Sequence, residues 1–189
     1  MIGIYKYKII ENEQLYGPGK RLLIFLKGCK IHCDGCINKH LWSFEDANFI
    51  SEEELVHICL SNNLEGVTLH GGEPLDQASS LFTLVSLIKK NNKTVVLFTG
   101  YKKNELNNDQ IKVWDSSDIV ISGRFELSKR NTNLQFRGST NQRVYTHKGK
   151  YKRYKINDCM TTTILTIDTS GNIDVNGFLT KDIMSLIKE

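Results

Sequence analysis

Short apolar segments alternate with helix-forming segments along most of this 189-residue chain, and this alternation limits the possible folds more than any other feature. Buried strands are expected at about 21–27, 66–70, 94–98 and 118–122. Helices are expected at about 51–61, 75–90 and 103–113, the first of them capped by the hydroxyl of Ser51. A strand followed by a helix, several times over, predicts an α/β fold with a mostly parallel sheet.

Shorter elements are expected at the two ends of the chain. Residues 2–10 alternate apolar side chains with lysines, which is typical of a half-buried strand. Residues 161–168 and 172–176 flank a Ser-Gly-Asn turn and predict a hairpin, followed by a short helix from about residue 180. No internal repeat or linker divides the chain, so we expect a single domain over residues 1–189.

The chain holds three cysteines within one short loop, directly after the first buried strand: Cys29, Cys33 and Cys36. Soft thiolate ligands favour zinc or an iron–sulfur cluster. Structural zinc sites normally have four ligands, often as two cysteine pairs, whereas the remaining Cys59 and Cys159 are isolated and are expected to be structural. Three thiolates on a four-iron cluster would leave one iron open to a substrate or cofactor. A zinc site completed by His32 or His40, or a fortuitous group of cysteines, are the alternatives.

Two further turns are expected beside the cysteine loop. Gly71–Pro74 and Thr99–Tyr101 follow the second and third buried strands. The carboxyl ends of parallel strands share one edge of a sheet, where ligands bind in α/β proteins. Taken alone, Gly71–Pro74 could equally be a tight turn before a helix, since proline suits the first helical turn.

Composition excludes several classes of protein. Hydrophobic residues make up 40% and charged residues 24%, which indicates neither disorder nor a membrane protein. The N-terminal segment lacks the cleavage site of a signal peptide, and the clustered cysteines suit a reducing cytoplasm better than a disulfide framework. We therefore expect a cytoplasmic protein with no membrane contact.

Basic residues concentrate late in the chain, although the net charge is only +4. Lysines and an arginine alternate with Tyr151 and Tyr154 over residues 148–155. Such a segment could contact nucleic acid or an acidic partner. The favoured interpretation is a solvated strand or loop that keeps its charges in water.

Five blocks, in this order, resemble the radical S-adenosylmethionine activases, and most closely the activating proteins of the anaerobic ribonucleoside-triphosphate reductase. The first block is the cysteine loop, preceded by Gly17–Arg21 and followed by Asn38 and Trp42. The other four lie at residues 71–75, 98–102, 122–126 and 136–142. Together they cover residues 15–145.

The resemblance implies a compact, incomplete (β/α) barrel with a core of about 15–146 and a C-terminal extension of about 147–189. It implies that Cys29, Cys33 and Cys36 hold a 4Fe–4S cluster whose fourth iron is chelated by S-adenosylmethionine. Reductive cleavage of that cofactor gives a 5′-deoxyadenosyl radical, which in activases takes a hydrogen from a glycine of a partner. The cluster and cofactor carry this chemistry, so no catalytic side chain is expected.

The resemblance also assigns contacts to S-adenosylmethionine, which we expect from Gly35, Cys36, Ile37, Gly71, Gly72, Glu73 and Thr99. Gly35 would let the backbone approach the adenine, and Gly71 and Gly72 would pass close to the methionine part. Glu73 would accept from the ammonium group or order the turn.

Several residues depart from the family pattern or have two interpretations. His70 stands where serine is common and Thr140 replaces a frequent serine, so His70 either substitutes for a hydroxyl or is a satisfied core histidine. Arg137, Asn141 and Gln142 are planar donors suited either to a carboxylate, ribose or peptide backbone or to structural bonding.

The resemblance implies a large glycyl-radical enzyme as partner, namely the anaerobic ribonucleotide reductase, and an electron donor such as flavodoxin or ferredoxin. Nucleic acid is not an expected partner. Two other functions stay open from the sequence: a stand-alone radical S-adenosylmethionine enzyme acting on a small molecule or ribosomal peptide, and a non-catalytic metal-binding module that holds nucleic acid.

Overall fold

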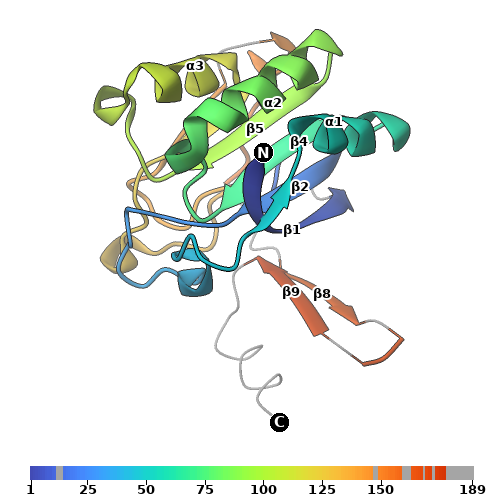
Figure 1. Cartoon of the computed structure of the whole chain (residues 1–189). Coiled ribbons are helices and arrows are strands. Elements are labelled where there is room, and N and C mark those ends of the chain that lie inside the picture. Colours follow the sequence, from blue (N-terminus) through green and yellow to red (C-terminus); the bar gives the residue numbers. More distant parts are fainter. Residues whose placement is uncertain (12–14, 147–148, 159–162, 168, 172, 178–189) are drawn as a thin grey trace.

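The protein folds around an open sheet of seven strands with α-helices on one face (Figure 1). The computed structural model describes residues 1–11, 15–146, 149–158, 163–167, 169–171 and 173–177. The strand order is β3-β1-β2-β4-β5-β6-β7, so the edge strands β3 and β7 do not pair and the sheet is not closed into a barrel. A separate hairpin, β8-β9, lies on the side away from the helices.

The strands of the sheet are β1 (Ile2–Glu11), β2 (Lys20–Leu26), β3 (Asn48–Ile50), β4 (Gly66–Gly71), β5 (Thr94–Thr99), β6 (Ile119–Ser122) and β7 (Arg143–Tyr145). The helices are α1 (Glu52–Ser61), α2 (Ala78–Lys90) and α3 (Asn108–Ser116), and the hairpin is β8 (Thr163–Ile167) with β9 (Ile173–Gly177). The four inner strands β2, β4, β5 and β6 are mutually parallel, as predicted. The three outer pairings are antiparallel, so the sheet is mixed rather than mostly parallel.

The helix starts follow from local side-chain caps. The Ser51 hydroxyl accepts from the amide of Glu54, which confirms the predicted start of α1. The helix expected from residue 75 begins as the 3-10 turn Pro74–Gln77, and α2 starts only at Ala78.

The helix predicted over 103–113 is wrong in its first part. Lys103–Glu105 forms a 3-10 turn, and α3 begins after Asn107, whose side chain accepts from the amides of Asp109 and Gln110. The helix expected from about residue 180 lies outside the described residues.

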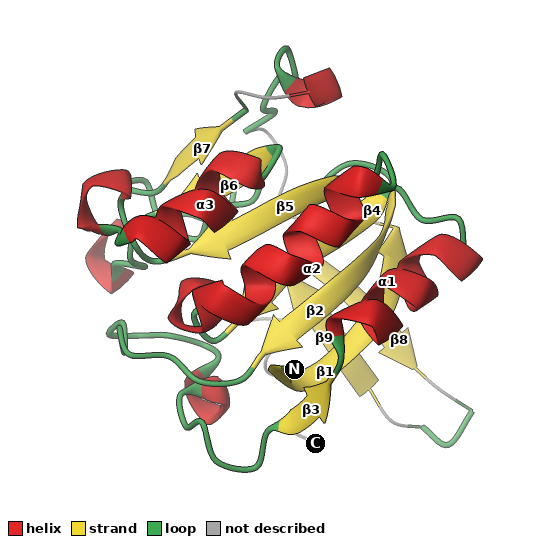
Figure 2. Cartoon of the chain, turned by 45° about the horizontal axis from the view of Figure 1, so that its top comes forward, coloured by secondary structure: helices red, strands yellow, loops and turns green. Residues whose placement is uncertain are grey.

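Alternation along the strands divides the sheet into two faces. The α-helices described here all cover one face (Figure 2). Leu22, Ile24 and Leu26 of β2 point to that face and join the main core. Burying each such side chain contributes about 1.5–3 kcal/mol. Cys59, fully buried on α1, belongs to this core, which agrees with its predicted structural role.

The opposite face holds the polar and aromatic side chains that matter for function. Arg21 and Phe25 of β2 lie on it, followed across the sheet by His70 of β4 and Phe98 of β5. A second, smaller apolar cluster on this face is made by Val96, Ile119, Ile121, Phe136 and Tyr151.

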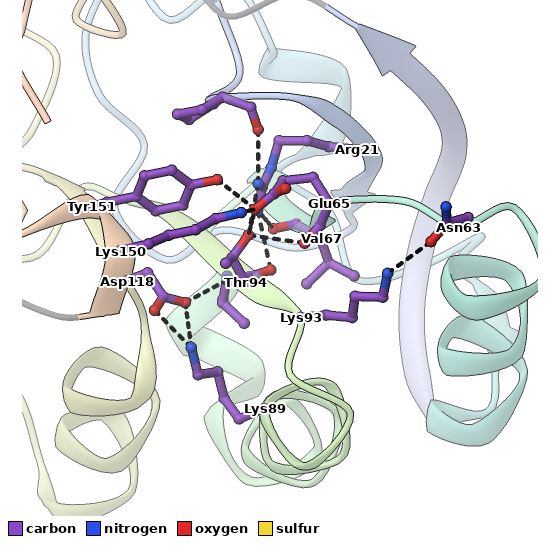
Figure 3. Close-up of polar contacts among 12 residues, drawn as sticks. Arg21, Asn63, Glu65, Val67, Lys89, Lys93, Thr94, Asp118, Lys150 and Tyr151 are labelled. Atoms are coloured by element: carbon purple, nitrogen blue, oxygen red, sulfur yellow. Dashed lines mark hydrogen bonds and ion pairs between the residues drawn. The ribbon is translucent and has the colours of Figure 1, made fainter.

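Arg21 ties three strands together at the amino edge of the parallel sheet (Figure 3). Its guanidinium is fully buried and donates to the carbonyls of Pro18, Val67 and Thr94. It also donates to the hydroxyls of Thr68, at 2.8 Å, and Thr94, at 2.9 Å. Removing this one side chain would leave several buried acceptors without a donor.

We therefore expect Arg21→Ala to lower the free energy of unfolding by about 3 kcal/mol or more, because unsatisfied buried acceptors are costly. Urea unfolding of the two proteins measures the difference. Lys93→Ala is the matched control, since Lys93 donates to Asn63 at 3.3 Å near the surface (Figure 3) and its removal should lower the free energy of unfolding by less than about 1 kcal/mol. Equal losses in the two variants would contradict this assignment.

Candidate functional site

The turns after β2, β4 and β5 meet at the carboxyl edge of the parallel strands and line one cavity. The cavity is lined by every residue that the sequence assigned to the cluster or the cofactor: Cys29, Cys33, Gly35, Cys36, Ile37, Gly71, Gly72, Glu73 and Thr99. Their individual roles as ligands stay predictions, but their common location is a property of the fold.

The cysteine loop is closed at its base by backbone hydrogen bonds. The amide of Gly28 donates to Leu41 at 2.8 Å, and the amide of Cys29 donates to Trp42 at 3.0 Å. Cys29 is buried, whereas Cys33 and Cys36 are partly exposed toward the cavity. The loop therefore begins from a fixed base and presents its thiols to one space.

Three thiols on one loop are the donor set of a 4Fe–4S cluster with one open iron, whereas a structural zinc site normally has four ligands. Zinc requires all its ligands within about 2.0–2.3 Å of one point. In the part of the chain that the structure describes, no group of three His, Cys, Asp or Glu side chains is placed to hold one metal ion. Thiolates on a four-iron cluster bind separate irons and need no such convergence. The histidines considered for zinc contact aromatic rings instead, His32 on Trp42 at 4.4 Å and His40 on Tyr5 at 5.3 Å.

Burial raises the pKa of the Cys29 and Cys33 thiols. The backbone amides of His32 and Ile31 oppose this rise in pKa at Cys29, and that of Phe125 does so at Cys33. Because metals bind the thiolate, the positive charge of iron must supply the remaining stabilisation of the anion.

Glu73 joins the exit of β4 to the exit of β5. Its carboxylate accepts from the amide of Leu75 at 2.9 Å, the hydroxyl of Thr99 at 2.8 Å and the amide of Gly100 at 2.7 Å. The side chain is only 2% exposed, and burial raises its pKa to about 7 despite these hydrogen bonds. Of the two predicted roles, ordering the turn is observed directly.

Close backbone packing requires a glycine at position 72, in addition to the predicted contact with the cofactor. A Cβ at this position would lie 2.1 Å from the carbonyl oxygen of Gly28 and 3.1 Å from that of Leu41. The glycine thus permits close packing against the base of the cysteine loop, and a larger residue would displace that loop. At position 35 the backbone is left-handed, with φ of +72°, and this conformation favours glycine.

His70 is a satisfied histidine at the floor of the cavity. Its Nδ1 accepts from the amide of Gly71 at 2.7 Å, and its ring is surrounded by those of Tyr16, Phe25 and Phe98. Burial lowers the pKa of His70 to about 4, so the ring is neutral near pH 7.

The donors Arg137, Asn141 and Gln142 make structural bonds. Arg137 pairs with the carboxylate of Asp158. The side-chain amides of Asn141 and Gln142 donate to the carbonyls of Arg124 and Gly123. These bonds hold the loop that follows β6 against the cavity, where Gln142 also contributes to the lining.

The apolar wall of the cavity was not predicted as such: Ile31, Trp42, Phe98, Ile121, Phe125, Leu127 and Phe136. Alternation along β5 and β6 would have placed Phe98 and Ile121 on this face, but the loop residues carry no comparable signal. The indole Nε1 of Trp42 is buried and has no hydrogen-bond partner among the described residues.

Comparison with known proteins agrees with this site. Residues 15–145 match the family described as a 4Fe-4S single cluster domain, which makes the protein an iron–sulfur protein. The chain belongs to the family of anaerobic ribonucleoside-triphosphate reductase-activating proteins. It is accordingly an enzyme of the radical S-adenosylmethionine class, with a 4Fe–4S cluster and S-adenosylmethionine as cofactors.

The relatives match over most of their own length. The activating protein of Escherichia coli K12 is 31% identical over 138 residues, which cover 68% of this chain and 90% of the relative. That of bacteriophage T4 is 31% identical over 147 residues, covering 74% and 92%. The solved structure of QueE from Escherichia coli shares 23% identity over 52% of each chain with a TM-score of 0.46, which is too low to carry an argument.

No helix of the described part of the chain is long and apolar enough to cross a membrane.

The low pKa of His70 predicts how stability depends on pH. In the unfolded chain His70 has a pKa near 6.5, whereas in the folded chain its pKa is about 4. Between these two pKa values only the unfolded chain binds the proton, so the free energy of unfolding should fall as the pH falls from about 6.5 to about 4. The slope from this group approaches about 1.4 kcal/mol per pH unit. Urea unfolding at pH 6.5 and 5.0 should show a smaller difference for His70→Gln. His57→Gln, on the exposed side of α1, should keep the wild-type difference; parallel curves for all three proteins would contradict the assignment.

Proposed function

We propose that this protein installs a glycyl radical on a separate, larger enzyme, the anaerobic ribonucleotide reductase. The observation that carries the proposal is that three thiols share one cavity with the turns after β4 and β5, in a chain that matches reductase-activating proteins over about 90% of their length. The same comparisons do not favour a stand-alone enzyme. Tyr151 is buried and Tyr154 half-buried, so neither ring is presented for base stacking.

In this proposal Cys29, Cys33 and Cys36 hold the cluster. When bound, the cluster and S-adenosylmethionine supply the one-electron cleavage chemistry. Glu73 lies at the cavity as a buried carboxylate, and a cationic ligand beside it would favour its ionised form. It is thus suited to accept from the cofactor's ammonium group.

The remaining assigned residues shape the space. Gly71 and Gly72 bring the backbone after β4 next to the cysteine loop, and the Thr99 hydroxyl holds Glu73 in place. The backbone at Gly35, Cys36 and Ile37 lines the same cavity and is the proposed contact for the adenine. The apolar wall opposite excludes water from the site.

The cavity also presents apolar surface toward solvent. Ile37 is 70% exposed and Leu127 is 52% exposed, and both line the cavity. Large exposed apolar side chains at a site commonly mark contact with another molecule. They suit a loop of the reductase that carries the acceptor glycine.

The broader assignments are proposed on the family match. Residues of about 15–146 form the catalytic core as an incomplete radical S-adenosylmethionine barrel, and about 147–189 are an extension within a single domain, because the match ends at residue 145. The protein acts in the cytoplasm, with flavodoxin or ferredoxin as the electron donor.

Cluster assembly tests the ligand assignment. Anaerobically purified protein should contain about four irons and four sulfides per chain. Cys33→Ala should lose most of this iron, because three thiolates are needed to hold the cluster. Cys59→Ala is the matched control and should retain the iron, since Cys59 lies in the helix-covered core. Colourless wild-type protein with stoichiometric zinc would refute the assignment.

Radical transfer tests the function itself. The reduced protein, mixed anaerobically with the reductase and S-adenosylmethionine, should produce a glycyl-radical doublet in electron paramagnetic resonance. The doublet should disappear when the acceptor glycine of the reductase is replaced by alanine. A protein that cleaves the cofactor yet never gives this signal with any encoded glycyl-radical enzyme would return the assignment to a stand-alone enzyme.

A further inference from the structure

A segment beyond the family match reaches the wall of the cavity. Residues 149–158, termed the strap, follow the matched region, which ends at residue 145. The strap packs on the sheet face opposite the helices, where Tyr151, Tyr154 and Ile156 join the smaller apolar cluster. It thereby connects the amino edge of the sheet with the loop that lines the cavity.

The beginning of the strap is anchored beside the Arg21 network (Figure 3). Tyr151 is 7% exposed, and its hydroxyl donates to the carboxylate of Glu65 at 2.6 Å. Lys150 forms an ion pair with the same carboxylate. Glu65 immediately precedes β4, so this anchor belongs to the rigid part of the sheet.

The end of the strap holds the residue on each side of Phe136. The amide of Gln135 donates to Asp158 at 3.1 Å, its side-chain amide donates to the hydroxyl of Tyr154 at 3.0 Å, and its side-chain oxygen accepts from the amide of Asn157 at 2.7 Å. On the other side, Arg137 donates to both carboxylate oxygens of Asp158. Asp158 therefore binds both neighbours of Phe136, and this pair of contacts is termed the grip.

Phe136 is the residue that this grip constrains. Its φ is +66°, a left-handed conformation that is unfavourable for a bulky side chain. Its ring stacks on Tyr154 with centroids 6.2 Å apart, meets Phe98 edge-on at 6.5 Å and lines the cavity. Such a conformation persists only when its surroundings hold it, and the strap supplies these surroundings.

We propose that the strap is a positioning element, in which Asp158 and Tyr154 hold Phe136 in its left-handed conformation and so set the wall against which S-adenosylmethionine binds. The identity of the ligand rests on the proposed function, whereas the constraint on the loop rests on the contacts above. Without the grip, Phe136 relaxes to an ordinary backbone conformation and the wall loses its shape.

The test compares Asp158→Ala with the parent protein after anaerobic cluster reconstitution. We expect the dissociation constant for S-adenosylmethionine, measured by equilibrium dialysis, to rise by about threefold to tenfold, the usual size of coupling through one positioning contact. Iron content should stay unchanged. Hydrogen exchange of residues 134–138, followed by mass spectrometry, should become faster. Lys152→Ala, an exposed position within the strap, is the matched control and should change neither quantity.

Two further variants keep the test decisive. Tyr154→Phe keeps the ring stack and removes one hydrogen bond, so it should raise the dissociation constant less than Asp158→Ala does. The double variant Arg137→Ala with Asp158→Ala should lose less binding free energy for S-adenosylmethionine than the sum of the two single variants, because each single change already removes the ion pair between the two residues.

The outcomes are distinct. A loss of thermal stability in Asp158→Ala with wild-type affinity and wild-type exchange at residues 134–138 would show that the strap only stabilises the fold, and would overturn the proposal. If the parent protein failed to bind S-adenosylmethionine, the proposed function would fall, and the exchange comparison would still decide whether the strap holds the loop. Unchanged exchange would overturn the proposal in that case as well.

Discussion

The parallel pairing of β2 with β4 is the interaction on which the rest of the site depends. The pairing ends with Leu26 opposite Gly71, and backbone hydrogen bonds continue beyond it. The amide of Gly72 donates to Leu26 at 2.9 Å, and that of Glu73 donates to Gly28 at 2.8 Å. These bonds join the turn after β4 to the base of the cysteine loop. Since Glu73 also binds Thr99 and Gly100, the same connection extends to the exit of β5.

The two edges of the parallel sheet have separate tasks. The amino edge carries the buried Arg21 and the ion pair of Lys89 with Asp118, whose carboxylate also accepts from the amide of Val95. These groups join neighbouring strands to one another and to α2, and Figure 3 shows Arg21, Lys89 and Asp118 with their polar contacts. The carboxyl edge carries the thiols and the buried carboxylate of Glu73. Stability concentrated at one edge leaves the other free to hold strained loops and solvent-facing cavities.

Sequence reasoning found what is local or periodic. The four inner strands, the start of α1 and the common location of the three turns follow from apolar runs, a capping serine and strand direction. The strands β3 and β7 were missed because three residues each are too few for periodicity. The start of α3 was misplaced because Asn107 offers a stronger cap than the polar residues before it.

The structural features that could not be predicted from the sequence depend on contacts between distant segments. The close approach of Gly72 to Gly28 arises only when two strands pair, so this packing constraint could not be predicted beside the expected contact with the cofactor. The grip of Asp158 on Gln135 and Arg137 likewise joins residues that no pattern connects. The charged side chains of the basic segment were expected to stay in water, and Lys152, Arg153 and Lys155 are exposed, but the burial of Tyr151 that makes the segment part of the fold has no signal in the sequence.

One-sided helix packing has a consequence for how the chain matures. The helix-covered core is complete once β7 has formed, but the apolar cluster on the other face of β5 and β6 also needs Tyr151, Tyr154 and Ile156. During synthesis these residues emerge after every strand of the main sheet, so the nascent domain exposes part of this apolar cluster until they have left the ribosome. Proteolytic cleavage after residue 145, with loss of the following segment, would expose the same apolar surface in the folded protein. Residues 149–158 thus cover an apolar surface of the kind that favours self-association when it is exposed.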